Sequence, residues 1–399
     1  MPPQSHRCRR PNLHPTPTAR PVRILHVVGG MNRGGVETWL LEILRHIDRD
    51  RFQMDFLVHT AEPCAFDEEL LSLGARIIFC QNARKPWLYA GNFRRAIAAH
   101  GPYDIVHSHV HTYSGYVLRL ARQAAIRSRI AHSHTDTRPQ RRRTGPLRRT
   151  YFALASREIR RHATAGLAAS VQAGDSLFGA GWQLRRRSRV LYFGCDLAAF
   201  RQDVDRRAVR AELGFSTDDL VIGHAGRFCE PKNHDFWVDV AAAMARREPR
   251  ARFLLLGDGP LRPAVEGKIA RLGLRERFRL TGVRSDVPRL LLGAMDMMLF
   301  PSLWEGLPLA VVEAQAAGLP CVVSQAVPEE AAVVPALLRC LPLSDGPGLW
   351  AQAVLAALRA RPRLGRLEAL GHLERGPFNI RASVAHLEEI YQEQLREAA

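Results

Sequence analysis

The stretch that decides the fold is SLWEGLPLAVVEAQAAG, residues 302–318, because it predicts a loop followed by a helix with a carboxylate in each part. Proline is favoured in the first helical turn, where its missing N–H costs nothing, and glycine is favoured just beyond the last turn. Pro308 and Gly318 therefore indicate a helix from about residue 308 to 317. Glu305 precedes this helix, whereas Glu313 lies on its apolar segment, where we expect a largely buried carboxylate.

The beginning of that helix is a candidate anion site. The free N–H groups of a first turn and the positive end of the helix dipole attract negative charge. A diphosphate near Gly306 and Leu307 would meet these groups, while a buried carboxylate such as Glu313 needs a polar partner of its own. A sugar nucleotide would satisfy the helix start and both carboxylates.

Composition is that of an ordinary folded protein. With 399 residues, 46% of them hydrophobic, the chain can form two domains with good cores. Its 7 cysteines include no C-x-x-C pair and fit a reducing compartment, and no apolar run is long enough to span a membrane. The Pro- and Arg-rich residues 1–21 lack the apolar core of a signal peptide, so we expect a disordered basic tail and a cytoplasmic protein.

The net charge of +18 is unevenly distributed. Residues 1–200 hold 31 basic and 14 acidic residues, whereas residues 201–399 hold 26 and 25. Arginine is densest in residues 138–161, where it alternates with apolar side chains. Two interpretations remain open, a solvated basic surface and a surface that associates with anionic lipid. No RNP-like motif, zinc-finger spacing or basic zipper is present, so we expect no nucleic-acid partner.

Apolar runs alternate with helical patterns in two series. This alternation predicts an α/β protein of two doubly wound, Rossmann-like domains, whose C-terminal strand ends face a central cleft. We assign residues 22–195 to an acceptor domain and 196–378 to a donor domain, and we expect a helix within 379–399 to pack back on the first domain. The predicted strands are 22–28, 54–59, 75–80, 104–108, 130–133, 166–170, 221–226, 252–256, 278–281, 297–300 and 321–324.

Gly34 and Gly35 follow the first predicted strand and open the first helix. Glycine there lets backbone amides approach a phosphate. The pattern is not G-x-G-x-x-G, which argues against a dinucleotide fingerprint and so against a dehydrogenase. A simple tight turn is an equally good interpretation.

Arg227 and Lys232 follow the first strand of the second half. A guanidinium fork and an ammonium group together can hold a diphosphate. The chain contains only three lysines, Lys85, Lys232 and Lys268, so a lysine in this loop runs against the composition of the protein. The alternative is a surface loop with incidental charges.

Histidines alternate at the ends of two neighbouring strands, at 107, 109 and 111 and again at 132 and 134. His-x-His spacing suggests a metal site. No carboxylate or cysteine accompanies these histidines at ligand spacing, so we expect no metal. Alternate histidines instead face the cleft, where neutral imidazole can hydrogen bond a sugar hydroxyl.

Taken in order, these motifs resemble the glycosyltransferases of family 4, which have the GT-B fold, over residues 22 to 395. Residues 25–31 and 34–37 are most similar to the bacterial branch that builds exopolysaccharide or capsule. Where relatives commonly have Asn-Gly between the domains, this chain has Phe193-Gly194. The motifs that carry the resemblance are Gly34-Gly35, His107-Ser108-His109, Gly226-Arg227 with Lys232, Gly257-Asp258-Gly259, and Glu305 with Glu313.

The resemblance implies a role for each candidate. Arg227 and Lys232 would bind the donor diphosphate, with Gly306 and Leu307 beside it and Gly34 and Gly35 letting the backbone come close. Glu305 would bind the transferred sugar and Glu313 the ribose. His109 would contact the sugar, with His111 as the alternative, and His134 would lie near the acceptor.

The implied function is a retaining hexosyl transfer from a nucleotide-sugar, UDP-linked by expectation, without a metal or other cofactor. The implied acceptor is a saccharide, free or polyprenyl-linked, in exopolysaccharide, capsule or cell-envelope synthesis. From the uneven charge we expect a cytoplasmic enzyme whose basic N-terminal domain associates with the inner face of the cytoplasmic membrane. A GT-B sugar-nucleotide epimerase and a non-catalytic GT-B scaffold are the alternatives.

Overall fold

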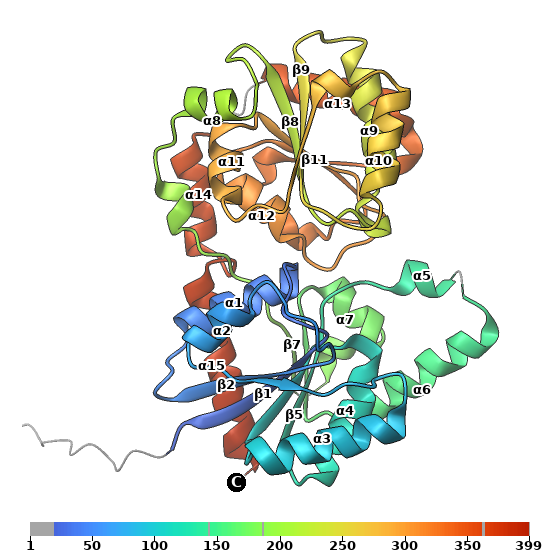
Figure 1. Ribbon diagram of the computed structural model, residues 1–399, viewed down its shortest axis with the longest axis vertical. Coiled ribbons are helices and arrows are strands. Elements are labelled where there is room, and N and C mark those ends of the chain that lie inside the picture. The colour runs from blue at the N-terminus through green and yellow to red at the C-terminus, as the bar shows by residue number, and fades with distance from the viewer. Residues whose placement is uncertain (1–19, 143, 186, 361–363, 399) are drawn as a thin grey trace, which may run out of the picture.

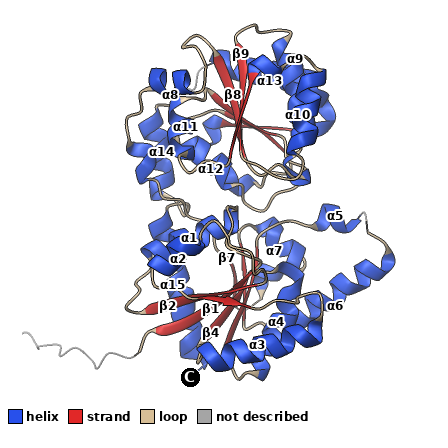
Figure 2. Cartoon of the chain, viewed as in Figure 1, coloured by secondary structure: helices blue, strands red, loops and turns tan. Residues whose placement is uncertain are grey.

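The computed structural model describes residues 20–142, 144–185, 187–360 and 364–398 (Figure 1). Nearly all of the predicted basic tail, residues 1–19, lies outside these ranges. The described chain forms two α/β units placed one above the other, each a parallel sheet with helices on both faces (Figure 2). The α/β fold class predicted from the sequence is confirmed.

The first sheet has 7 parallel strands in the order β3-β2-β1-β4-β5-β6-β7. Its strands are β1 (Val22–Val28), β2 (Phe52–Val58), β3 (Ile77–Phe79), β4 (Ile105–Ser108), β5 (Ser128–Ser133), β6 (Ala165–Ala168) and β7 (Ser188–Val190). Its helices are α1 (Gly35–His46), α2 (Asp67–Ser72), α3 (Pro86–His100), α4 (Ser114–Gln123), α5 (Arg138–Arg142), α6 (Pro146–His162) and α7 (Val171–Phe178), with the 3-10 turn η1 (His111–Tyr113) before α4.

The second sheet has 6 parallel strands in the order β10-β9-β8-β11-β12-β13. Its strands are β8 (Leu220–Ala225), β9 (Ala251–Leu256), β10 (Phe278–Gly282), β11 (Met297–Phe300), β12 (Cys321–Ser324) and β13 (Leu338–Leu341). The helices of this half are α8 (Arg206–Glu212), α9 (His234–Ala245), α10 (Arg262–Arg271), α11 (Val287–Gly293), α12 (Leu309–Ala316), α13 (Gly346–Ala360) and α14 (Arg366–Arg375), with the 3-10 turn η4 (Glu230–Lys232) before α9.

The strand order reverses at one place in each sheet, between β1 and β4 and between β8 and β11. The loops that leave two such neighbouring strands diverge to opposite faces of the sheet and open a crevice. Four of the predicted motifs follow these strands: Gly34-Gly35 follows β1, His109 follows β4, Arg227 follows β8 and Glu305 follows β11. The topology therefore places two of these motifs at the crevice of each sheet.

The sequence did not predict two strands, β7 and β13. Both are edge strands, and none of their residues is fully buried. An edge strand needs no continuous apolar run because one of its sides and much of its surface face solvent. The apolar pattern used to find the other strands is absent from both segments.

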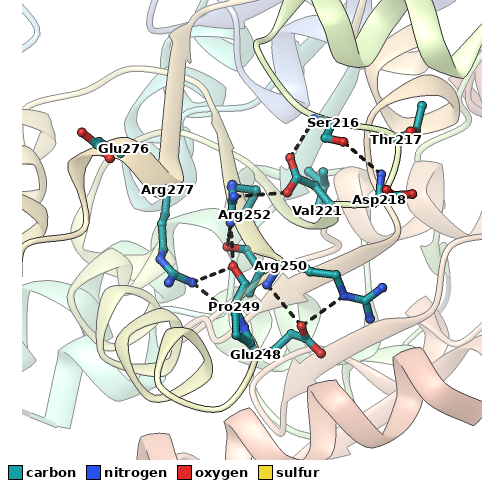
Figure 3. Close-up of polar contacts among 12 residues, drawn as sticks. Ser216, Thr217, Asp218, Val221, Glu248, Pro249, Arg250, Arg252, Glu276 and Arg277 are labelled. Atoms are coloured by element: carbon teal, nitrogen blue, oxygen red, sulfur yellow. Dashed lines mark hydrogen bonds and ion pairs between the residues drawn. The ribbon is translucent and has the colours of Figure 1, made fainter.

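Arginines in the second domain are neutralised locally. At the beginnings of β8 and β9, Arg252 lies 3.3 Å from an Asp219 oxygen and donates to the Pro249 carbonyl, and Arg277 donates to the same carbonyl (Figure 3). Arg250 and Glu248 form a further ion pair at 3.2 Å in this group. These residues lie where the strands begin, at the end of the sheet opposite the predicted motifs, so we assign their charges no part in the site.

The final helix, α15 (Ile380–Ala398), lies against the first domain (Figure 1). Trp39 of α1 donates from Nε1 to Ser383 Oγ at 3.1 Å. A Cβ on Gly194 would lie 2.5 Å from Ile380 Cα, so only glycine allows the connecting chain to pass the beginning of α15. Leu387 and Tyr391 are fully buried, which makes α15 part of the core of the first domain.

We predict that Leu387→Ala lowers the free energy of unfolding by about 2–5 kcal/mol, because it removes a fully buried side chain and leaves a cavity. Urea denaturation followed by circular dichroism measures this. Glu389→Ala, an exposed change on the same helix, should stay within about 0.5 kcal/mol of the wild type. Equal effects of the two substitutions would show that α15 is not integral to the core.

Candidate active site

The two domains touch at the floor of the cleft. The Asp136 N–H donates to the Glu305 carbonyl at 3.1 Å, and Thr135 and Gly306 form an isolated β-bridge. A Cβ on Gly306 would lie 1.7 Å from the His134 carbonyl oxygen, so only glycine permits this approach. The two domains are therefore in direct backbone contact at Glu305 and Gly306.

Glu305 and Lys232 form an ion pair inside the cleft. Lys232 Nζ lies 2.7 Å from Glu305 Oε1 and 4.8 Å from the centre of the Phe300 ring. Glu305 is only 7% exposed, so the pair is held in a largely dry environment. From the sequence we assigned Lys232 to a diphosphate and left Glu305 free for a sugar. In this structure the two side chains are joined, and a bound diphosphate would have to share Lys232 with Glu305.

Arg227 and the glycine loop lie on opposite sides of the cleft. Arg227 is exposed, and Gly35 begins α1 with open space where a Cβ would stand. Burial raises the pKa of Glu37 on α1, and the positive charge of Arg227 opposes that rise, so the two groups lie close enough to interact across the cleft. From the sequence we assigned no role to Glu37, although it lies two residues after Gly35.

Glu313 lies on α12 as predicted, but it is only partly buried. Burial, together with the nearby Glu42 charge, raises its pKa to about 7. No described residue forms a hydrogen bond or an ion pair with its side chain.

The helix that carries Glu313 has close to its predicted bounds. Gly306 and Leu307 are buried in the loop before α12, and the helix begins at Leu309 with Pro308 as its N-cap. Gly318, just beyond its end, has the predicted left-handed conformation with a φ of +73°.

The histidines gather beneath the cleft. His109, 8% exposed, lies with its Nε2 2.9 Å from His26 Nδ1 and its Nδ1 2.9 Å from His134 Nε2. His111 instead lies in η1, with its Nε2 3.3 Å from Thr137 Oγ1. The structure thus places two candidate residues, His109 and His134, in direct contact, whereas the His111 ring contacts Thr137 instead.

Among the described residues, two groups of three histidines have the spacing of metal ligands. His26, His107 and His109 form one group and His109, His132 and His134 the other, with the candidate nitrogens of each within 4.8 Å of one another. Hydrogen bonds between rings already occupy most of these nitrogens. The spacing is thus explained without an ion, and the absence of a metal stays a prediction.

Comparison with known proteins assigns the chain to a family. Residues 34–195 match the model of a glycosyl transferase 4-like domain, and residues 219–360 match that of glycosyl transferases group 1. EpsF of Bacillus subtilis, named as a glycosyltransferase, is 36% identical over 349 residues, which cover 86% of this chain and 89% of EpsF. The chain belongs to the glycosyltransferases of family 4. A second relative is CapH of Staphylococcus aureus, which is named as a capsular polysaccharide biosynthesis glycosyltransferase. It is 22% identical, and the alignment covers 93% of this glycosyltransferase and 98% of CapH.

Solved structures show the same fold. HepE of Anabaena, solved in complex with UDP and glucose, superposes with a TM-score of 0.77 at 20% identity, covering 93% of this glycosyltransferase and 100% of HepE. WaaG, a glycosyltransferase of lipopolysaccharide biosynthesis, superposes with a TM-score of 0.68 at 15% identity. The alignment covers 94% of this glycosyltransferase and 98% of WaaG. The GT-B fold predicted from the sequence is confirmed.

We predict that Glu313 makes stability depend on pH. Because its pKa is raised to about 7, the folded state keeps a proton that the unfolded state releases near pH 4.5. The stabilisation is complete below about pH 4.5 and is lost as pH rises through 7. Between pH 5 and 8 the free energy of unfolding of the wild type should fall by about 3 kcal/mol relative to Glu313→Gln. Urea titrations at several pH values measure this difference.

The matched control for this experiment is Glu389→Gln, which alters an exposed carboxylate. It should follow the wild-type pH profile. A constant gap between wild type and Glu313→Gln across the whole range would mean that the carboxyl titrates normally.

Proposed function

We propose that this glycosyltransferase transfers a hexose, with retention of configuration, from a UDP-sugar to a saccharide or lipid-linked acceptor in bacterial exopolysaccharide, capsule or cell-envelope synthesis. The observation that carries the proposal is the Lys232–Glu305 pair in a cleft bordered by Arg227 and the beginning of α1. The solved HepE complexes with UDP-glucose support the donor class. A partial relative from Escherichia coli, 34% identical over 139 residues, is named for galactose transfer to a diphosphoundecaprenol acceptor.

The donor diphosphate would lie between Arg227 and Lys232, near Gly306 and Leu307. Arg227 is exposed to the cleft and offers a fork to phosphate oxygens, while Lys232 adds a point charge in a partly dry place. Stabilising the negative charge of the departing nucleoside diphosphate is the main catalytic contribution available here. No step of this scheme requires a metal ion.

Glu305 and Glu313 would bind the hydroxyl groups of the donor. When the diphosphate draws Lys232 away, Glu305 becomes free to accept hydrogen bonds from the transferred sugar. Glu313 has no partner among the described residues, and a ribose could supply one. Gly34 and Gly35 lie opposite, where small residues leave room for the backbone of α1 to approach the phosphates. His109 would contact the sugar only by giving up one of its two ring partners, His26 or His134, and His134 would face the acceptor.

We predict that Lys232→Ala lowers kcat roughly 100-fold and weakens UDP binding, because the diphosphate loses a nearby positive charge. UDP release in the presence of donor and acceptor measures turnover, and calorimetry measures binding. Lys268→Ala is the matched control, since Lys268 pairs with Asp235 and Asp239 and has no contact with the cleft residues. Near-normal turnover of Lys232→Ala with an established donor would contradict the proposed site.

The same assay separates the two alternative functions. An epimerase would consume UDP-sugar without an acceptor, whereas a transferase releases UDP at an appreciable rate only when the acceptor is present. A non-catalytic scaffold would neither release UDP nor require Lys232.

We also propose that the first domain binds the anionic inner face of the cytoplasmic membrane, through α6. Leu147, Tyr151 and Leu154 are 88%, 50% and 56% exposed and lie three or four positions apart, so they share one side of the helix. Arg157 and Arg161 continue that side and are exposed. Apolar side chains among arginines are typical of a helix that lies in a lipid interface. Among the described residues, no helix is long and apolar enough to cross a membrane.

We predict that changing Leu147, Tyr151 and Leu154 together to serine lowers binding to phosphatidylglycerol-containing liposomes at least roughly tenfold, because their apolar surface no longer enters the interface. Vesicle co-sedimentation measures this. Leu184→Ser, which replaces an exposed leucine outside α6, should bind as the wild type does. If the fraction bound to vesicles changes neither with the triple substitution nor with added salt, the proposed surface is contradicted.

A further inference from the structure

Arg141 of α5 is a partly buried cation, and two of its nitrogens lack a partner. Its Nε and Nη2 are buried and form no hydrogen bond with any described residue. The guanidinium lies over the Phe152 ring of α6, with its Cζ 4.6 Å from the ring centre. Burial lowers the pKa of Arg141, and the charge of Asp136 opposes that change. Because arginine stays protonated in proteins, its buried donors favour an anionic acceptor.

A second guanidinium lies close to the same ring. Arg148 of α6 is exposed, and its Cζ is 5.8 Å from the centre of the Phe152 ring. It forms no hydrogen bond or ion pair with a described residue. Two positive charges beside one ring repel each other, and a shared anion removes that repulsion. The pair therefore has the charge and the free donors of an anion site.

The neighbouring chain offers no carboxylate for this anion. Residues 137–157 hold 7 arginines and no Asp or Glu. Asp136 precedes them, but both of its oxygens already accept hydrogen bonds from Arg138. Glu158 follows them and pairs with His162 at 3.3 Å. Within the described part of the chain no carboxylate pairs with either guanidinium, which favours an anion supplied by a ligand.

The pair borders the cleft on one side. α5 begins two residues after Asp136, whose N–H donates to the Glu305 carbonyl at the domain contact. Burial and then the charge of Arg141 lower the pKa of His111 to about 4, so the guanidinium lies near that ring. α5 and α6 project from one side of the first domain, with α5 nearer to the second domain (Figure 1). Arg141 is thus on the side of the cleft that we assign to the acceptor.

On its other side the pair adjoins the apolar face of α6. The Phe152 ring lies beside the Tyr151 ring, with centres 5.7 Å apart, and Tyr151 shares the exposed face that contains Leu147 and Leu154. From the domain contact outward, the contacts pass from hydrogen-bonding groups to guanidinium groups and then to exposed apolar side chains. A saccharide joined to a lipid through phosphate has its parts in the same order.

We propose that Arg141 and Arg148 bind the phosphate group that joins the acceptor saccharide to its lipid. The proposal rests on the proposed function, and it selects the lipid-linked acceptor from the two classes named there. Arg141 donates from Nε and Nη2, a fork that matches two oxygens of one phosphate, while Arg148 adds positive charge from the solvent side. The lipid then continues over the exposed face of α6.

Binding of farnesyl diphosphate, a short lipid diphosphate, tests the site on the full chain. Calorimetric titrations are done at saturating UDP, so that the donor diphosphate is already in place. Arg141→Gln should weaken binding at least roughly tenfold, because two charge-assisted hydrogen bonds are lost. Arg141→Lys should weaken it less, because lysine keeps the charge but not the fork.

Two comparisons control this titration. Arg94→Gln, which removes an exposed arginine of α3, should bind farnesyl diphosphate as the wild type does. Farnesol, which lacks phosphate, should bind the wild type far more weakly than farnesyl diphosphate. Equal affinities of wild type and Arg141→Gln for farnesyl diphosphate, with unchanged circular dichroism, would overturn the proposal and leave the Phe152 contact as packing alone.

Kinetics separate the phosphate of the acceptor from that of a membrane lipid. Without vesicles, Arg141→Gln should raise the KM of a farnesyl-diphosphate-linked saccharide roughly tenfold, and leave UDP affinity and the KM of the phosphate-free saccharide unchanged. If Arg141→Gln instead loses binding to phosphatidylglycerol vesicles while the KM stays the same, the site takes a lipid headgroup and the proposal is overturned. If farnesyl diphosphate binding depends on Arg141 but no acceptor receives sugar, the proposed function fails and the phosphate site stands.

Discussion

The backbone contact between the two domains, Glu305 and Gly306 against residues 134–136, is the constraint on which the site depends. It allows Glu305 to be buried, and a buried carboxylate is stable there because Lys232 lies at 2.7 Å. The same contact sets the His134 backbone against the loop that precedes α12. The proposed donor side and acceptor side are therefore held together by one short stretch, and glycine at 306 makes the approach possible.

Much of the fold followed from local patterns in the sequence. The eleven predicted strands correspond to observed strands, and Gly318 ends α12 in the predicted conformation. The two missed strands, β7 and β13, lie at sheet edges, where apolar patterning is weak. The site was predictable as a set of residues, but their pairing was not. Lys232 and Glu305 are 73 positions apart, and nothing local indicates that they meet.

The buried histidine cluster shows the same limit more clearly, because hydrogen bonds link its rings to one another and to the Tyr391 hydroxyl. Alternation at residues 107–111 and 132–134 indicated which rings share a face, but it gave no role to His26 or Tyr391. His26 joins because β1 and β4 pair with His26 opposite His107. Tyr391 joins because α15 returns to the first domain after the whole second domain. Both facts depend on tertiary register, which no periodicity in one segment records.

The position of α15 also bears on how the protein is made. The first domain obtains part of its core from residues 380–398, which the ribosome delivers only after the second domain has been synthesised. During translation the emerging first domain lacks Leu387 and Tyr391, and the surface that they cover stays open. The core of the first domain is therefore completed only after the second domain has been synthesised, although the sheet of each domain is continuous in sequence.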